Sequence, residues 1–300
     1  MKKLSKMRLL FFVLVLLGAA CSSTTPPPQS NSVGSLLLAE PEPVSSRLQL
    51  VIARYTHMLY QTELQDEERA ELLFQRGIVY DSIGLASLAR IDFNQALRLK
   101  PDMAAAYNSI GVHMTQARQF LQAYEAFDAS LDIDPQYNFA ILNRAIALYY
   151  GGRSELAQKD TLAYLALNES DPIRLLWHYI VRRDIDEIAA FDMMLARREQ
   201  LDDSQWATSI IDFYLGRVNE ATVVATLIED VESQTQLNNR LCEAYFYLGK
   251  FHAYKGNTSA AANYFKLALS TNIHEYIEHR YARLELSNLR IAAREIQLNE

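Results

Sequence analysis

Two stretches of the chain repeat one pattern of residues at a fixed spacing. The first reads "LFQRGIVYDSIGLASLARIDFNQALRLKP" (residues 73–101) and the second reads "YNSIGVHMTQARQFLQAYEAFDASLDIDP" (residues 107–135). The matched positions, each 34 residues apart, are Gly77 and Gly111, Ala89 and Ala123, Phe93 and Phe127, and Pro101 and Pro135. A spacing that holds at all these positions in two adjacent copies indicates a structural unit that stacks on its own copies.

The residue types explain how such a unit folds. Gly77 and Ala89 are small, which suits the point where two antiparallel helices cross closely. Phe93 is large enough to fill the space toward the next pair, and Pro101 cannot continue a helix, so it begins the next turn. Small, aromatic and proline positions at this period form the tetratricopeptide (TPR) pattern. We therefore predict an all-α fold, a TPR α-solenoid of antiparallel helix pairs with a leading helix and a C-terminal capping helix.

The pattern weakens in the middle of the chain and returns near its end. It is loose after Pro135, and it is restored in "YFYLGKFHAYKGNTSAAANYFKLAL" (residues 245–269). The predicted order is an N-terminal helical segment at 44–69, TPR units at 70–103 and 104–137, a degenerate TPR at 138–171, TPR-like helix pairs at 172–241, a TPR unit at 242–275, and a C-terminal capping helix with a tail at 276–300.

The start of the chain has the layout of a bacterial secretory signal. Residues 1–8 hold four basic residues and no acid, and the apolar run Leu9–Leu17 is followed by three small residues and then Cys21. A run of this length cannot cross a bilayer, which takes ~20 apolar residues in a helix. We therefore predict a signal peptide at residues 1–20. Its junction with Cys21 resembles the lipobox of bacterial lipoproteins.

Cys21 is accordingly the predicted lipidation site and the first residue of the mature protein. A lipobox usually has leucine three residues before the cysteine, where this chain has Gly18, so a plain cleavage site with an incidental cysteine stays open. Ser22 resembles the residue found in lipoproteins sorted to the outer membrane. Residues 21–43 are predicted to be the lipidated cysteine and a flexible tether. Within the tether, Leu36–Leu38 either docks on the folded body or is an apolar patch of linker.

Net charge argues against nucleic acid as a partner, and the cysteine content argues against a disulfide within the chain. Without residues 1–20, which carry four basic residues, the formal charge falls from −7 to about −11. Nucleic acid is therefore a poor partner, because phosphate neutralisation supplies its non-specific affinity. If Cys21 is lipidated, Cys242 has no partner within the chain, and we expect it to be a small buried packing residue.

The sequence offers no convincing catalytic or metal site. "HEYIEHR" (residues 274–280) is the nearest approach to a metal motif, but its histidines are five residues apart, whereas a zinc-protease helix needs them four apart. Charge pairs on an exposed helix are the favoured interpretation. We predict no catalytic residues, no metal, no cofactor and no enzymatic activity.

A TPR solenoid presents a concave surface lined by the first helix of each pair. On the TPR template that surface is apolar and aromatic here, with a polar rim, which suits a peptide or helix inserted sideways. The predicted partner-binding residues are Phe74, Asp81, Asn108, Gln116, Leu142, Tyr149, Tyr150, Phe246, Lys250 and Tyr254. Leu142 could instead pack between repeats, and packing is an equal alternative for Tyr149 and Tyr150.

Several longer stretches resemble one family of TPR lipoproteins. They are "DEERAELLFQRGIVYDSIGLASLARIDFNQALRLKPDM" (66–103), "YNFAILNRAIALYYGGRSELAQKD" (137–160), "SQWATSIIDFYLGRV" (204–218) and "HEYIEHRYARLELS" (274–287). These resemble the NlpI family of outer-membrane lipoproteins from about Ser46 onward. The match is weakest at residues 182–200 and in the last ten residues.

The resemblance implies an adaptor on the periplasmic face of the outer membrane. Members of this family are homodimers, and the resemblance implies that the segment 44–69 takes part in dimerisation. They bind peptidoglycan endopeptidases and a periplasmic tail-specific protease, and so limit murein cleavage. The resemblance also supports Cys21 as the lipid site. The alternative is a TPR lipoprotein that assists secretin or outer-membrane protein assembly, and an enzyme of murein turnover is a third possibility.

Overall fold

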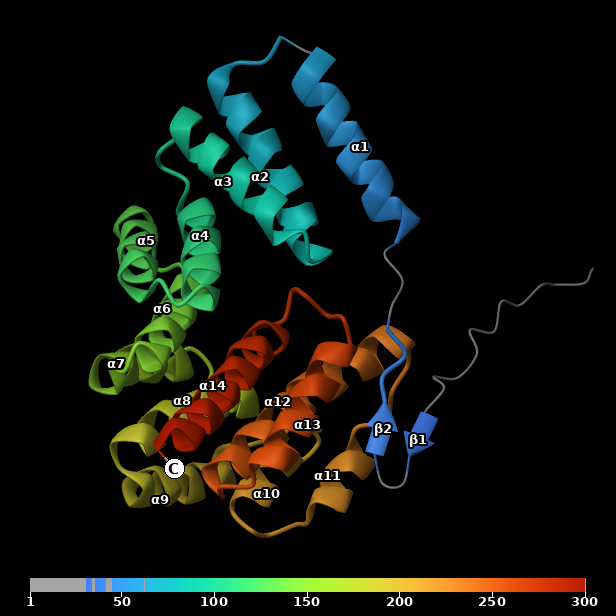
Figure 1. The fold of residues 1–300 in the computed structure, drawn as a ribbon, viewed down its shortest axis with the longest axis vertical. Helices are drawn as coiled ribbons and strands as arrows, with labels where there is room; N and C mark the ends of the chain where they lie inside the picture. The colour runs from blue at the N-terminus through green and yellow to red at the C-terminus, as the bar shows by residue number, and fades with distance from the viewer. Residues whose placement is uncertain (1–30, 34–35, 42–44, 62, 300) are drawn as a thin grey trace, which may run out of the picture.

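The computed structural model describes residues 31–33, 36–41, 45–61 and 63–299, and most of these residues are α-helical. Successive helices pack as pairs that follow an arc from α1 to α13 (Figure 1). The helices are α1 Ser46–Gln61, α2 Asp66–Ser82, α3 Ala86–Leu99, α4 Ala104–Gln116, α5 Phe120–Ile133, α6 Asn138–Tyr150, α7 Ser154–Ala166, α8 Pro172–Ile185, α9 Glu187–Arg197, α10 Thr208–Tyr214, α11 Glu220–Thr226, α12 Gln234–Tyr254, α13 Thr258–Ser270 and α14 Ile277–Asn299. The predicted all-α TPR solenoid is confirmed.

The repeated small and large residues lie where the two helices of a pair cross. A Cβ atom added to Gly77 would lie 2.6 Å from the ring of Phe93, and one added to Gly111 would lie 2.7 Å from the ring of Phe127. A Cβ atom at Gly249 would meet a third phenylalanine ring at 2.6 Å. These distances are too short for a methyl group, so the helices can approach this closely only because glycine stands at each position.

The middle of the chain forms helix pairs without the signature residues. Asp171 caps α8 by accepting a hydrogen bond from the backbone N–H of Ile173 at 2.9 Å, and Pro172 occupies the first helical turn. Trp177 of α8 is fully buried and packs on Phe246 of α12, with ring centroids 5.6 Å apart. A buried contact between helices so far apart in the chain shows that the middle pairs share one core with the last repeat.

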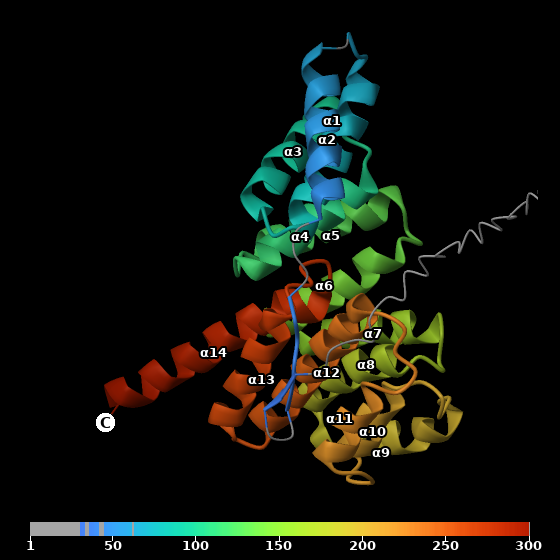
Figure 2. The same cartoon turned by 90° about the vertical axis from the view of Figure 1, so that its right-hand side faces the viewer.

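The last helix, α14, does more than cap the final repeat. It packs on α13, as predicted for residues 276–300, and it also crosses the inner side of the arc (Figure 1). Arg280 Nη2 lies 2.7 Å from Asp81 of α2, and Glu285 accepts a hydrogen bond from the Tyr150 hydroxyl of α6 at 2.8 Å. Figure 2 shows the C-terminal part of α14 extending away from the body. The solenoid is therefore closed across its inside by its own C-terminal helix.

A short hairpin precedes the helices and packs on the body. Strand β1 (Asn31–Val33) pairs antiparallel with β2 (Leu36–Leu38). Leu37 is buried, its carbonyl accepts a hydrogen bond from the Tyr245 hydroxyl, and Asn238 of α12 donates to the carbonyl of Glu40 at 2.8 Å.

The prediction of a flexible tether over residues 21–43 is thus wrong for residues 36–41. A backbone carbonyl buried against a tyrosine hydroxyl gives this part of the tether a fixed position, and docking is the correct alternative for the three leucines. Cys21 and the predicted signal peptide lie outside the described residues.

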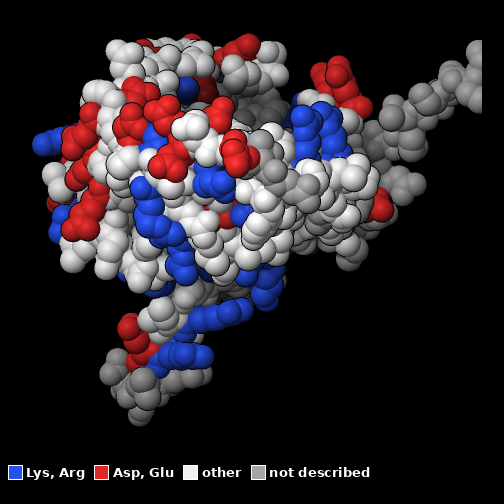
Figure 3. Space-filling view, turned by 90° about the horizontal axis from the view of Figure 1, so that it is seen from above, with Lys and Arg blue, Asp and Glu red and all other residues white. Residues whose placement is uncertain are grey.

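Acidic and basic side chains lie together on one face of the body. Figure 3 shows acidic and basic residues interspersed over the face that is drawn. Interspersed charges do not create the one-sign field that attracts a polyanion. In the described part of the chain, no helix combines the length and the apolar character that spanning a bilayer requires.

Candidate functional site

The structure distributes the predicted groove residues along the inner side of the arc. Those near its start already have partners. Phe74 packs on Phe93 with ring centroids 5.7 Å apart, and Asn108 is buried and accepts a hydrogen bond from Asn143 at 3.0 Å. Gln116 is half-buried at the end of α4. Leu142 is buried in the main core, which favours its packing alternative.

Asp81 connects three helices. Its carboxylate lies 2.9 Å from His113 Nε2 of α4 and 2.7 Å from Arg280 Nη2 of α14. Burial raises the pKa of Asp81, but the hydrogen bond to His113 and the charge of Arg280 outweigh it and lower that pKa below the ordinary value. Asp81 therefore stays ionised and fixes the beginning of α14 against the first repeat.

Three more of the predicted residues form one buried cluster with α14. Lys250 Nζ lies 2.6 Å from Glu285 Oε1 and 2.8 Å from the Tyr149 hydroxyl. Tyr150 stacks on Tyr281 with ring centroids 5.3 Å apart. Burial is the largest single influence and lowers the pKa of Lys250, but the charge of Glu285 together with Tyr149 and the hydrogen bonds to both residues outweighs it, so that pKa lies above its usual value. Lys250 and Tyr150 are thus already in contact with α14, and their role in partner binding stays a prediction.

The two remaining predicted residues, both on α12, have opposite surroundings. Phe246 is fully buried against Trp177. Tyr254 is half-buried, its ring centroid lies 5.1 Å from Lys250 Nζ, and it lines an open pocket of about 320 Å³. Binding of a partner by the predicted set stays a prediction, and Tyr254 is the member whose surroundings leave space for one.

The walls of this aromatic pocket come from α8, α9, α10 and α12. Its residues are Tyr179, Arg183, Glu187, Ile188, Phe191, Tyr214, Phe251, Tyr254 and Lys255. The Tyr214 ring lies 5.5 Å from Tyr179 and 5.3 Å from Phe251, centroid to centroid, and both pairs meet edge to face. Burial raises the pKa of Tyr179 and of Tyr214, so both hydroxyls stay protonated at neutral pH. The floor is a preformed aromatic surface.

The rim of the aromatic pocket is more basic than acidic. The Arg183 guanidinium carbon lies 4.0 Å from the ring centroid of Tyr254, and Lys255 Nζ lies 5.6 Å from that of Phe251. Glu187 is the acidic residue of the lining and pairs with Arg183 at 2.9 Å. The exposed Lys255 ammonium is therefore placed to receive a negative group from a ligand whose apolar part enters the pocket.

An exposed apolar stripe continues from the pocket along α9. Ile188, Phe191 and Leu195 recur three and four residues apart, and Ile188 is 75% exposed. Side chains at this spacing share one face of a helix. This face is visible in the sequence as a spacing of apolar residues, but none of its residues is among the predicted binding residues, because α9 was predicted only as half of a helix pair.

Part of the chain matches a known family model. Residues 70–103 match the family model described as "Tetratricopeptide repeat". The chain therefore contains a tetratricopeptide repeat at these residues. It is similar to the crystal structure of a tetratricopeptide repeat protein from Parabacteroides merdae, with 16% identity, a TM-score of 0.49, and coverage of 82% of this chain and 100% of that one.

Two other solved TPR structures show the same kind of likeness. YrrB, described as a TPR protein with an unusual peptide-binding site, is 15% identical with a TM-score of 0.39, and the match covers 82% of this chain and 100% of that one. PilW, described as a widely conserved type IV pilus biogenesis factor, is 17% identical with a TM-score of 0.35, and the match covers 79% and 98%.

Proposed function

We propose that this TPR protein is a lipid-anchored adaptor on the periplasmic face of the outer membrane. It binds peptidoglycan endopeptidases and a tail-specific protease, and so regulates the level of cell-wall hydrolases and murein turnover. The protein makes and breaks no bond itself. The aromatic pocket is the observation that carries the binding role, and the resemblance to the NlpI family supplies the partners.

The chemistry of the pocket narrows what a partner segment must offer. Its aromatic floor, formed by Tyr179, Tyr214 and Phe251, suits an apolar or aromatic side chain. Lys255 at the rim suits a neighbouring carboxylate. Exposed Ile188 extends the contact beyond the pocket. A segment with an apolar anchor beside an acidic residue is therefore the proposed ligand class.

The proposed mechanism is an increase in effective concentration. A protein that holds the protease and its substrate together converts a weak encounter into an intramolecular one, with local concentrations of roughly millimolar for suitable tethers. Dimerisation through the 44–69 segment would bring together two such platforms. Anchoring through Cys21 would confine them to the membrane surface.

The test is a pull-down from solubilised envelopes with the soluble chain that starts at Ser22, read by mass spectrometry. Recovery of a tail-specific protease together with a cell-wall endopeptidase supports the proposal. Recovery of a secretin or of a barrel-assembly component instead assigns the fold to the alternative function.

Matched variants test the pocket itself. Ile188→Ser and Lys255→Glu are expected to weaken capture, each by about 1–2 kcal/mol or roughly 5- to 30-fold in Kd. The controls are Leu121→Ser, at a leucine that is 64% exposed on α5, and Lys266→Glu, at an exposed lysine on α13. Equal capture by the pocket variants and the controls would remove the aromatic pocket from the binding site.

Separate experiments address the anchor, the dimer and the absence of catalysis. Cys21→Ser should release the protein from the membrane fraction, and unchanged membrane association would contradict lipidation. Sedimentation of the soluble chain as a monomer at micromolar concentration would contradict the dimer. Release of muropeptides from purified sacculi by this protein alone would contradict the non-enzymatic role.

A further inference from the structure

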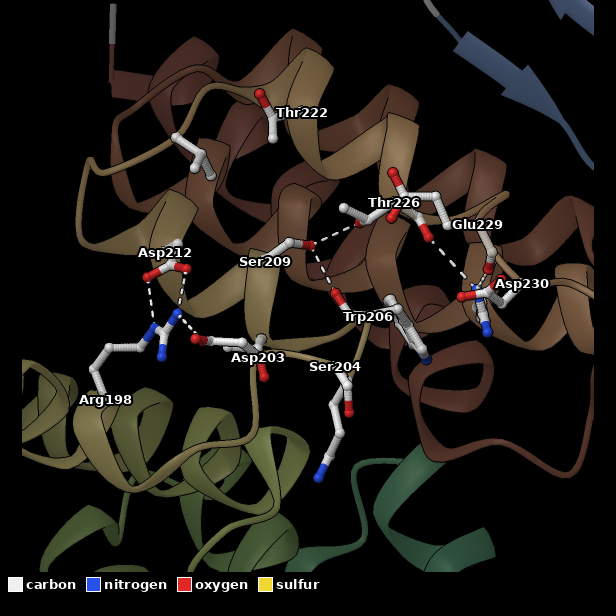
Figure 4. Close-up of a pocket in the computed structure, with 14 residues that line it drawn as sticks. Arg198, Asp203, Ser204, Trp206, Ser209, Asp212, Thr222, Thr226, Glu229 and Asp230 are labelled. Carbon is white, nitrogen blue, oxygen red and sulfur yellow. Dashed lines mark hydrogen bonds and ion pairs between the residues drawn. The ribbon is translucent and has the colours of Figure 1, made fainter.

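A second cavity, of about 340 Å³, lies between the turn at residues 201–207, helices α10 and α11, and the first half of α12 (Figure 4). It shares no lining residue with the aromatic pocket. Its size falls within the range of about 300–1,000 Å³ that small-molecule sites occupy. We call it the Trp206 cup, because the half-buried indole of Trp206 is its aromatic wall.

The polar walls of the cup are held in place before any ligand arrives. Arg198 donates two hydrogen bonds to Asp212, at 2.6 and 2.8 Å, and a third to Asp203 at 2.6 Å. On the other wall, Arg240 Nη1 donates to the carbonyl oxygen of Glu229 at 2.6 Å. Fixed side chains lower the entropic cost of binding, so the cup is organised to receive a ligand.

The arrangement of aromatic and polar groups favours a polyhydroxylated ligand. Figure 4 shows Trp206 between the Arg198 ion pairs on one side and Glu229 and Asp230 on the other. The indole offers an apolar surface, with the Arg240 guanidinium carbon 5.9 Å from its ring centroid, and the surrounding carboxylates and guanidinium groups offer acceptors and donors. A pyranose ring has the matching surfaces, since its C–H bonds form an apolar face and its hydroxyl groups both donate and accept.

Charge distinguishes this ligand from the alternatives. The ionisable side chains of the lining are Arg198, Arg240, Asp203, Asp212, Glu229 and Asp230, two basic and four acidic, which gives a formal charge of −2. Phosphates and carboxylates are therefore repelled. A cation would have to bind through Glu229 and Asp230, because Asp203 and Asp212 are already paired with Arg198, and the guanidinium groups of Arg198 and Arg240 in the same lining would repel it. A neutral ligand with many hydroxyl groups meets neither difficulty.

We propose that the Trp206 cup binds a neutral saccharide of one or two pyranose rings. The sugar stacks on the indole of Trp206, and its hydroxyl groups bond to Glu229, Asp230 and the free edge of the Arg240 guanidinium. This site is separate from the aromatic pocket. Saccharide binding in the Trp206 cup therefore does not depend on the proposed adaptor function.

The indole N–H signals of the chain give a direct test. The sequence has two tryptophans, and Trp177 is fully buried with its Nε1–H pointing at Glu278 at 3.4 Å. In ¹⁵N-correlated spectra of the soluble chain, titration with chitotriose, cellotriose or maltotriose should move the Trp206 signal and leave the Trp177 signal in place. Saturation at millimolar concentration, typical of weak ligands, is the expected result.

Two variants make the result decisive. Glu229→Gln, at an exposed rim position, is expected to raise the saccharide Kd about fivefold, since it removes one charged acceptor. Glu187→Gln, at the rim of the aromatic pocket, should leave that Kd unchanged. A Trp206 signal that stays in place with every saccharide up to about 10 mM overturns the proposal. The same holds if inorganic phosphate or a lysine-rich peptide moves it as far as the sugars do.

Discussion

The buried ion pair between Lys250 of α12 and Glu285 of α14 is expected to hold α14 across the inner side of the solenoid. The two groups are 2.6 Å apart, and their side chains are only 4% and 8% exposed. At an effective dielectric constant of about 20, the attraction at this distance is of the order of 6 kcal/mol, before the cost of burying both charges. Breaking such a pair by removing one charge typically costs about 3–5 kcal/mol, because the other charge stays buried.

Glu285→Gln should therefore weaken the attachment of α14 by about 3 kcal/mol, near the lower end of that range. The amide can still accept a hydrogen bond from Lys250 and from the Tyr150 hydroxyl, but it carries no charge. The expected result is at least about 100-fold faster hydrogen exchange of the α14 amides, measured by mass spectrometry at neutral pH.

A second pair serves as the control. Arg183 and Glu187 are 2.9 Å apart, but the Glu187 side chain is 63% exposed, so Glu187→Gln should cost less than about 1 kcal/mol. The double variant Lys250→Met with Glu285→Leu should recover most of the lost protection, since it leaves neither charge buried alone. If Glu285→Gln changes α14 exchange no more than Glu187→Gln does, the argument for a buried latch is wrong.

Three further predictions concern stability. Gly111→Ala should lower the free energy of unfolding, measured in urea, by about 1–3 kcal/mol, because the added Cβ would lie 2.7 Å from the ring of Phe127. A variant as stable as the parent would contradict the close crossing of the two helices. Burial lowers the pKa of His178 and of His279 to about 4, so the unfolded chain takes up these protons first, near pH 6.5, and each histidine should lower stability by roughly 1.4 kcal/mol per pH unit between pH 6.5 and 4. Burial raises the pKa of Glu243 and of Glu278, so these carboxyl groups act in the opposite direction as pH falls. The loss of stability between pH 7 and pH 5, measured by urea unfolding, should therefore be smaller in His178→Gln than in the parent, and an equal loss in both would refute this. Tyr245→Phe removes the hydroxyl that bonds strand β2, at a cost of about 1 kcal/mol, and should speed proteolysis before residue 45; unchanged cleavage would show that other contacts hold the hairpin.

The repeat period made part of the candidate binding surface predictable from the sequence. A fixed period assigns each side chain to a fixed face of its helix, which is how the TPR template gave the groove positions, but Leu142 and Phe246 are buried in the core. Tyr254, one of the predicted residues, lines an open pocket. The other walls of that pocket come from α8, α9 and α10, which lack the repeat signature, so no single stretch of sequence marks them as neighbours.

The sequence by itself determined the helix pairs and how closely they pack. Gly77 and Phe93 meet within one repeat, and a contact between adjacent helices leaves its mark as a spacing of residue types. Only the tertiary structure decided that α14 closes the inner side. Arg280 pairs with Asp81 and Glu285 with Tyr150, contacts that span 199 and 135 residues. The small rotation between successive helix pairs adds up over the whole arc to bring these residues together, and no local pattern records that sum.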